Sequence, residues 1–289
     1  MEGSMSARPR ARTSRGPVIE RRRPDAFVAE FVGTLLLVLF ICTIVVMNSA
    51  GGLGFTDWSV IGLVHFLLLA MLIHTLGGVS GGHFNPAVTI TLGALRKIAW
   101  PDAGVYIVLQ VLGGLAGALI VKLLLDQEGQ PANFGAPAVS EQFLEGKAIS
   151  GFFVEAIGTF ALMWAIMGVA VSSQGARDWA GLVIGGTLGF AVMCFGPLTG
   201  AGLNPARAFG PALVGGAFNG AGEFIVAYVL GPIVGALAAG MLYTAGIIGP
   251  EGRLARRPVD TLSGRDESTR PETGRIEMPP GTTRPTDVP

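Results

Sequence analysis

The chain has 289 residues, of which 50% are hydrophobic and only 14% are charged. Soluble domains usually carry about 25% charged residues, so this composition excludes an ordinary soluble protein and indicates a membrane protein. The formal net charge is zero, but the charge is gathered at the two ends, and the first 25 residues contain seven Arg. We expect residues 1–25 and 249–289 to be disordered tails, because segments this polar have no apolar face to bury.

Six apolar runs between the tails are long enough to cross a bilayer. They predict an all-α membrane protein with one membrane domain over residues 26–248. Two cysteines, Cys42 and Cys194, lie inside the runs, so no disulfide framework is implied. In chain order the predicted spans are Ala26–Asn48, Trp58–Leu76, Ala103–Leu125, Ile149–Val171, Trp179–Leu198 and Phe224–Ile248.

Lys and Arg are distributed unevenly between the two sides of the predicted membrane domain. An even number of spans puts both tails on one side, which also receives all the basic residues except Lys122, Lys147 and Arg207. Basic residues accumulate on the cytoplasmic side of membrane proteins. We therefore expect both termini to be cytoplasmic and the chain to lie in the plasma membrane.

The tripeptide Asn-Pro-Ala occurs twice, as Asn85-Pro86-Ala87 and as Asn204-Pro205-Ala206. Pro suits the first position of a helix, and Asn suits the capping position before it. The helix predicted over Pro86–Leu95 would be about 15 Å long, half of a hydrocarbon core of roughly 30 Å. The sequence thus predicts two half-helices, one between the second and third spans and one between the fifth and sixth.

An internal repeat relates the two parts of the membrane domain. The segment Phe27–Thr34 resembles Phe152–Thr159, and both contain Glu-x-x-Gly-Thr. Each repeat, about 26–125 and 149–248, holds three spans and one half-helix, and the odd number of spans inverts the second repeat relative to the first. Inverted repeats bring discontinuous helices together near the bilayer midplane, where irregular backbone must be buried or line water. The pattern predicts a central aqueous path.

Two Asn-Pro-Ala boxes, each within a three-span half that opens with Glu-x-x-Gly-Thr, resemble the aquaporin (major intrinsic protein) family over about residues 26–248. The resemblance implies a right-handed bundle of six transmembrane helices plus two half-helices, in inverted three-span repeats. It also implies a passive channel domain and a homotetramer with one pore per subunit.

Asn85 and Asn204 are interpreted as pore donors whose amide groups bond passing water. The two positive helix ends beside them would repel cations and discourage proton passage. The alternative is that both residues only cap their helices.

The resemblance places a selectivity filter at His65, Val192, Ala201 and Arg207. Arg207 would offer fixed donors to a polar solute and repel cations, and the small Val192 and Ala201 would leave the filter wider than in the strictest water channels. The alternatives are a headgroup-facing Arg207 and a core His65. We expect His74 to pack against neighbouring side chains and His83 to fix its loop.

Glu30 and Glu155 are the two carboxylates inside the predicted spans. A carboxylate within a membrane is functional by default, so a proton-carrying role is one interpretation. We favour a structural role, in which each accepts hydrogen bonds from the backbone N–H groups of its half-helix loop. No nucleophile–base pair, metal-spaced His/Cys set or phosphate-binding loop occurs in the sequence. We therefore expect no enzyme activity, metal, cofactor or nucleic-acid partner.

Two departures from the family pattern bear on the solute. The glycerol-conducting branch typically has Asp directly after the filter Arg, where this chain has Ala208. An aromatic pair common before Gly-Pro in the last span is here Tyr228-Val229. The leading hypothesis is a passive channel in the bilayer that conducts water and excludes ions and protons. The alternatives are a broader facilitator of ammonia, hydrogen peroxide, urea or glycerol, and a non-conducting membrane scaffold.

Overall fold

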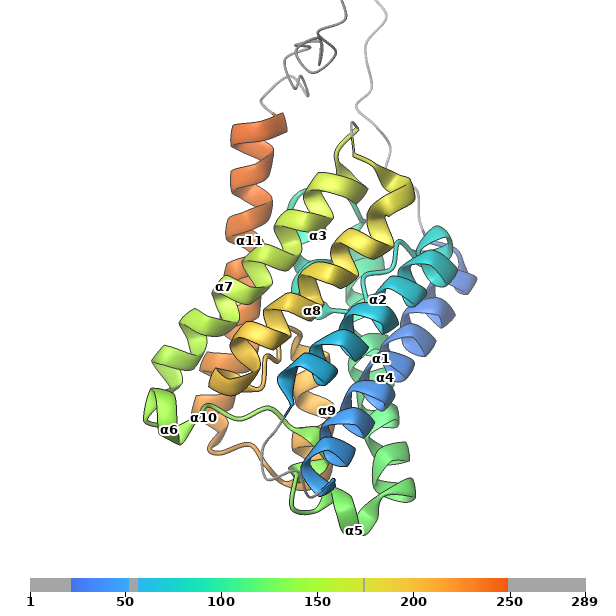
Figure 1. The fold of residues 1–289 in the computed structure, drawn as a ribbon. Coiled ribbons are helices and arrows are strands. Elements are labelled where there is room, and N and C mark those ends of the chain that lie inside the picture. The colour runs from blue at the N-terminus through green and yellow to red at the C-terminus, as the bar shows by residue number, and fades with distance from the viewer. Residues whose placement is uncertain (1–21, 52–56, 174, 249–289) are drawn as a thin grey trace, which may run out of the picture.

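The computed structural model describes residues 22–51, 57–173 and 175–248 (Figure 1). Most of the two predicted tails, residues 1–21 and 249–289, lies outside the described residues. Within the described part, helix α1 begins at Pro24, inside the segment expected to be a tail. Pro occupies the first helical position there, where its missing N–H has no partner to lose.

The described residues contain six helices long and apolar enough to cross a membrane. The second of them has a side-chain cap: Asp57 accepts from the backbone N–H groups of Ser59 and Val60, and Gly81 ends this helix at φ 94°. The first five are α1 (Pro24–Ala50), α2 (Trp58–Ser80), α4 (Trp100–Leu124), α7 (Ala148–Ile166) with its π-helical continuation η2 (Met167–Val171), and α8 (Ala180–Thr199).

The sixth span consists of four consecutive helical segments. They are α10 (Ala221–Phe224), the π-helical η4 (Ile225–Leu230), α11 (Gly231–Tyr243) and the π-helical η5 (Thr244–Ile248). The first span begins, and the sixth ends, at the same end of the bundle (Figure 1). An even number of crossings requires this arrangement.

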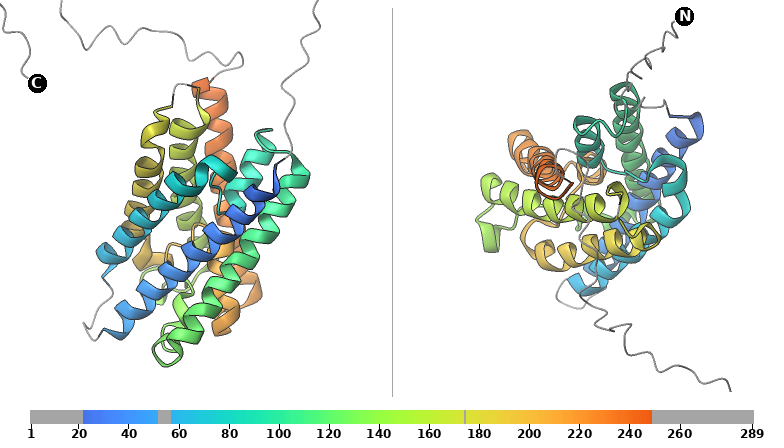
Figure 2. Two further views of the ribbon diagram at one scale, coloured as in Figure 1. Left: turned by 90° about the vertical axis from the view of Figure 1, so that its right-hand side faces the viewer. Right: turned by 90° about the horizontal axis from the view of Figure 1, so that it is seen from above.

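Two short helices lie inside the bundle, α3 (Pro86–Ala94) and α9 (Pro205–Gly215). They have 9 and 11 residues and occupy opposite halves of the molecule (Figures 1 and 2). These are the two half-helices that the sequence predicts. The remaining short elements lie in the connections: α5 (Asp126–Gly129), η1 (Asn133–Gly135), α6 (Glu141–Leu144) and η3 (Arg177–Trp179).

Glycines allow the long helices to approach closely. A Cβ atom on Gly62 of α2 would lie 2.7 Å from the carbonyl oxygen of Gly189 in α8, and one on Gly189 would lie 2.8 Å from that of Gly62. The contact is therefore reciprocal, as expected where two inverted repeats meet at a pseudo-twofold axis. In a bilayer the hydrophobic effect does not drive helices together. Small residues let their backbones approach closely, so that van der Waals contacts hold the helices together instead.

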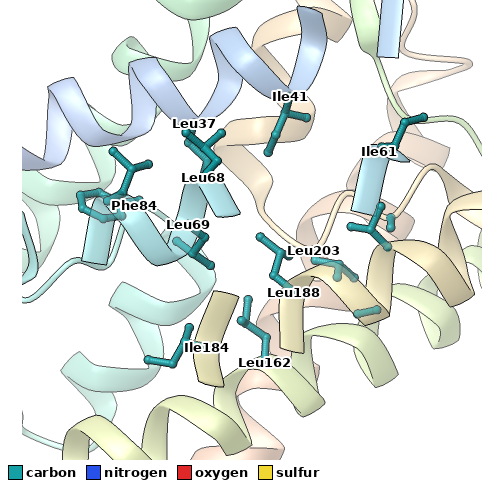
Figure 3. Packing of buried hydrophobic residues seen from close by; sticks show 14 of the residues in the cluster. Leu37, Ile41, Ile61, Leu68, Leu69, Phe84, Leu162, Ile184, Leu188 and Leu203 are labelled. Carbon is teal, nitrogen blue, oxygen red and sulfur yellow. The ribbon is translucent and has the colours of Figure 1, made fainter. Parts of the chain in front are cut away.

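The central apolar cluster connects both repeats (Figure 3). Side chains of α1, α2, α7 and α8 meet there, and Phe84 and Leu203 join them from the loops before the half-helices. Large apolar side chains such as Leu67, Phe153 and Phe190 are more than half exposed. A soluble protein rarely leaves so many exposed, whereas a helix surface in contact with lipid requires them.

Candidate functional site

The two Asn-Pro-Ala motifs cap the half-helices and contact each other's loops. The Asn85 side-chain oxygen accepts from Ala87 N–H, and that of Asn204 accepts from Ala206 and Arg207 N–H. The Asn85 amide nitrogen donates to the Leu203 carbonyl at 2.9 Å. The Asn204 amide nitrogen donates to the Phe84 carbonyl at 2.8 Å. An amide nitrogen carries two hydrogens, so each Asn retains one for another acceptor.

The backbone before each half-helix is left-handed at a bulky residue. Phe84 has φ 47° and Leu203 has φ 49°, a conformation that side chains of this size rarely adopt. Both side chains are fully buried in the central cluster, which compensates for the unfavourable backbone. Their carbonyls are the acceptors of the two Asn amides, so the packing of the loops fixes the geometry of the motifs.

Glu30 organises the first loop from α1. Its carboxylate accepts hydrogen bonds from the Ser80 hydroxyl at 2.6 Å and from the backbone N–H groups of His83 and Phe84 at 2.9 and 2.7 Å. The Gln110 side chain donates a fourth bond at 2.8 Å. Glu30 is completely buried, so these four donors replace the water that a buried carboxylate would otherwise need.

Glu155 organises the second loop from α7 in the same way. It accepts from the Thr199 hydroxyl at 2.6 Å and from the backbone N–H groups of Gly202 and Leu203. Both carboxylates thus receive the loop hydrogen bonds that the structural interpretation of these residues requires.

A narrow cavity of about 70 Å³ runs past both motifs. That volume has room for several water molecules. Its walls are mostly aliphatic, including Leu69, Leu162 and Ile184. The polar side chains that line it are His65, His83, Asn85, Asn204 and Arg207. A solute inside therefore meets few hydrogen-bonding groups, and those few determine what can pass.

His65 and Arg207 both line this cavity, and each has a side-chain nitrogen without a partner. The His65 Nδ1 atom lies 2.8 Å from the Ile61 carbonyl; a carbonyl only accepts, so this nitrogen carries the hydrogen and Nε2 of the neutral ring is an acceptor. Arg207 donates through Nη1 to the Gly135 carbonyl at 3.0 Å. His65 Nε2 and Arg207 Nε are buried and have no partner in the described chain. Together they offer one acceptor and one cationic donor.

The other two predicted filter residues do not line the described cavity. Val192 and Ala201 are 0% and 1% exposed and belong to the central apolar cluster. Leu69 and Leu162, which do line the cavity, belong to the same cluster. The role of Val192 and Ala201 in the filter stays a prediction.

Several residues at the site were not predicted from the sequence. Gln110 joins Glu30 to Thr89, and the Thr89 hydroxyl also bonds to His83 Nδ1 at 3.1 Å. The His83 ring thus bonds to the first half-helix, and the residue also lines the cavity. An isolated Gln in the apolar run Ala103–Leu125 is the signal that could have identified Gln110.

The site combines features that act on charge. The N-termini of α3 and α9 meet at the two Asn residues, where each helix end carries partial positive charge. Arg207 adds a full positive charge and is 3% exposed. In aliphatic surroundings these charges disfavour a cation strongly, while a neutral polar solute can still bond to the remaining donors and acceptors.

Six spanning helices around a polar cavity with opposed half-helices define an integral multi-pass membrane protein of the channel class. The model of the family described as major intrinsic protein matches residues 20–243. The chain belongs to the major intrinsic protein family. Members of this family are passive channels and not enzymes.

Relatives in three kinds of organism resemble the chain over most of its length. A probable aquaporin, AqpM, of Archaeoglobus fulgidus is 40% identical over 238 aligned residues, which cover 75% of this chain and 94% of that protein. Nodulin-26 of Glycine max is 38% identical, with 75% of each chain covered. A glycerol uptake facilitator protein-like 6 of Lactiplantibacillus plantarum is 37% identical and covers 78% of this chain and 98% of its own.

Among solved structures, the aquaglyceroporin from Plasmodium falciparum superimposes with a TM-score of 0.64. The two chains are 25% identical, and the match covers 77% of this chain and 96% of that one. The predicted aquaporin-like fold of six spans and two half-helices is thereby confirmed.

Proposed function

We propose that the chain conducts water through the central cavity and excludes ions and protons. The observation that carries the proposal is the reciprocal contact of Asn85 and Asn204, which holds two helix N-termini together at a cavity otherwise lined mainly by aliphatic side chains. Each Asn keeps one N–H for a passing oxygen. A water molecule there accepts from the Asn amides, so it turns its hydrogens away from the positive helix ends, and proton transfer along the file is interrupted.

Selection among solutes is proposed to occur at His65 and Arg207. The Arg207 guanidinium would donate to the solute oxygen, and His65 Nε2 would accept a hydrogen from it. A cation would meet the full charge of Arg207 without compensation. The small side chains of Val192 and Ala201 would leave the filter wider than in the strictest water channels.

A second candidate is a broader facilitator of neutral solutes such as ammonia, hydrogen peroxide, urea or glycerol. The printed names of relatives include a glycerol uptake facilitator-like protein and an aquaglyceroporin. The small residues predicted in the filter, Val192 and Ala201, favour this candidate, whereas Ala208 in place of Asp argues against glycerol. A non-conducting scaffold would need neither the buried cation of Arg207 nor the paired Asn residues.

The proposal also covers the oligomeric state, the membrane topology and the two tails. We infer a homotetramer in the plasma membrane with both termini cytoplasmic, and a channel domain over residues 26–248 that conducts without the two tails. Size-exclusion chromatography with light scattering would measure the oligomeric state. A variant lacking residues 1–20 and 255–289 should retain its water permeability.

The test is stopped-flow light scattering on vesicles that contain the purified full chain. Water permeability should exceed that of protein-free vesicles, and urea and glycerol permeability should stay low. In His65→Ala the larger neutral solutes should pass more easily while ions remain excluded, because Arg207 is intact. In Arg207→Val the exclusion of small cations should weaken.

The outcomes separate the candidates. High glycerol or urea permeability of the unmodified chain would establish the broader facilitator. An unchanged urea and glycerol permeability in His65→Ala would remove His65 from the filter. If the vesicles gained no permeability to water or to any of the solutes, the non-conducting scaffold would be the remaining candidate.

A further inference from the structure

The guanidinium of Arg207 has one hydrogen bond to the described chain, and its acceptor is the carbonyl of Gly135. Gly135 belongs to η1, in the connection between α4 and α7, 72 residues away in sequence. Arg207 Nε is buried without a partner. The direction in which the filter cation points therefore depends on where this connection holds the Gly135 carbonyl.

The backbone that presents this carbonyl is unusual. Asn133, Phe134 and Gly135 have φ values of 47°, 52° and 83°, three consecutive left-handed residues. Gly adopts this conformation readily, but a bulky residue such as Phe rarely does. Such a turn persists only where its surroundings hold it in place.

The Phe134 side chain supplies that support. It is 4% exposed and packs in an apolar cluster with α1 and α4. The Lys122 ammonium lies 5.5 Å from its ring centroid, at a distance suited to a cation–π interaction. The cluster partners are Val38, Cys42, Val46, Ala118 and Val121. The ring does not line the cavity, so its effect on a solute can only be indirect.

Close packing leaves the turn little freedom to move. A Cβ atom on Gly135 would lie 2.9 Å from the Cα atom of Cys42 in α1. One on Gly215, at the end of α9, would lie 3.0 Å from the Asn133 carbonyl oxygen. The turn is thus held between the first helix of one repeat and the half-helix that carries Arg207.

We propose that Phe134 is a positioning residue of the selectivity filter. Its buried ring holds the left-handed turn so that the Gly135 carbonyl fixes the Arg207 guanidinium, and solute selection depends on the ring although no solute touches it. This inference rests on the proposed role of Arg207 in the filter. Without the ring, the turn would relax to common backbone conformations, and the guanidinium would lose its acceptor and its fixed direction.

The test is a double-mutant cycle on the full chain in vesicles, with the ratio of urea to water permeability as the readout. Phe134→Ala should raise this ratio about threefold or more, because a hydrogen bond to a charged group is lost. In the Arg207→Val background, Phe134→Ala should change the ratio no further, because the group through which it acts is gone. Phe143→Ala, an exposed Phe in the same connection, is the matched control and should leave the ratio unchanged.

Phe134→Leu keeps most of the buried apolar volume and should give a smaller change than Phe134→Ala. If the alanine variant does not fold, the leucine variant is put through the same cycle and decides by the same criterion. Equal changes from Phe134→Ala with and without Arg207 would overturn the inference, and so would an unchanged ratio in a folded Phe134→Ala protein. An unchanged ratio in Arg207→Val would instead contradict the proposed filter.

Discussion

The two inverted repeats use one set of supports for their half-helices. Glu30 and Glu155 hold the two loops, and each accepts from a hydroxyl and from two backbone N–H groups. The hydroxyls of Tyr106 and Tyr228 donate to the carbonyls of the residues that end α2 and α8, both at 2.8 Å. The framework that places the half-helices is therefore duplicated almost atom for atom.

The repeats differ in what they add to this framework. The first repeat adds Gln110, which gives Glu30 a fourth donor and links it to Thr89 and His83. The second repeat adds Arg207, held by a carbonyl from the connection between the repeats. Duplicated residues therefore build the pore, and Arg207, which the second repeat alone carries, adds a full positive charge to it.

The largest effects are expected where the shared framework is broken. Glu30→Leu leaves four buried donors without an acceptor, and Glu155→Leu leaves three. Each buried donor without an acceptor lowers the free energy of unfolding by about 1–3 kcal/mol. Both variants should lose most of their folded yield, and Glu30→Leu should be the worse. The measurement is the monodisperse yield in detergent together with the thermal unfolding midpoint. Glu30→Gln and Glu155→Gln, which keep one acceptor oxygen, are the matched controls. A folded, stable Glu30→Leu protein would contradict this account.

A smaller effect should distinguish the two caps. Asn204 accepts from two backbone N–H groups and Asn85 from one. Replacing an Asn cap by Ala costs about 0.5–2 kcal/mol, so Asn204→Ala should lie nearer the upper limit and Asn85→Ala nearer the lower. Asn204→Ala should also increase cation leak more than Asn85→Ala does, because the Asn204 side chain accepts a hydrogen bond from the backbone N–H of Arg207. Unfolding midpoints and ion flux in vesicles test both statements. Equal losses in the two variants would show that the caps are equivalent.

The smallest effect is expected when the first repeat is made more like the second. Gln110→Met removes the fourth donor of Glu30 but leaves the three that Glu155 also has. The loss should be about 1 kcal/mol, the typical net value of one hydrogen bond. Water permeability should stay close to that of the unmodified chain. A loss as large as that of Glu30→Leu would mean that Gln110 belongs to the framework itself.

Much of the fold could be predicted because hydropathy and helix-start signals are local. The first run, Ala26–Asn48, is extended by two residues at each end in α1. The half-helix predicted over Pro86–Leu95 ends one residue earlier, at Ala94. The inverted arrangement followed from the number of spans in each repeat, which needs no knowledge of side-chain contacts.

The site was less predictable because its contacts join distant segments. Asn133 and Gly135 favour left-handed backbone, but the local pattern does not indicate that Phe134 adopts it too or that the turn holds Arg207. The position of a side chain relative to the cavity wall also depends on helix rotation, which counting along the chain does not give. Val192 and Ala201 belong to the central apolar cluster and are not among the residues that line the described cavity, so their role in the filter stays a prediction.

The central claim is that two opposed half-helices form a pore that conducts water and blocks protons. The most direct test measures both fluxes on one preparation of vesicles containing the unmodified chain, with light scattering for water and an internal pH dye for protons. We expect a water permeability well above that of protein-free vesicles, with no increase in proton flux. Water and proton permeability that rise together, or a water permeability equal to that of empty vesicles, would contradict it.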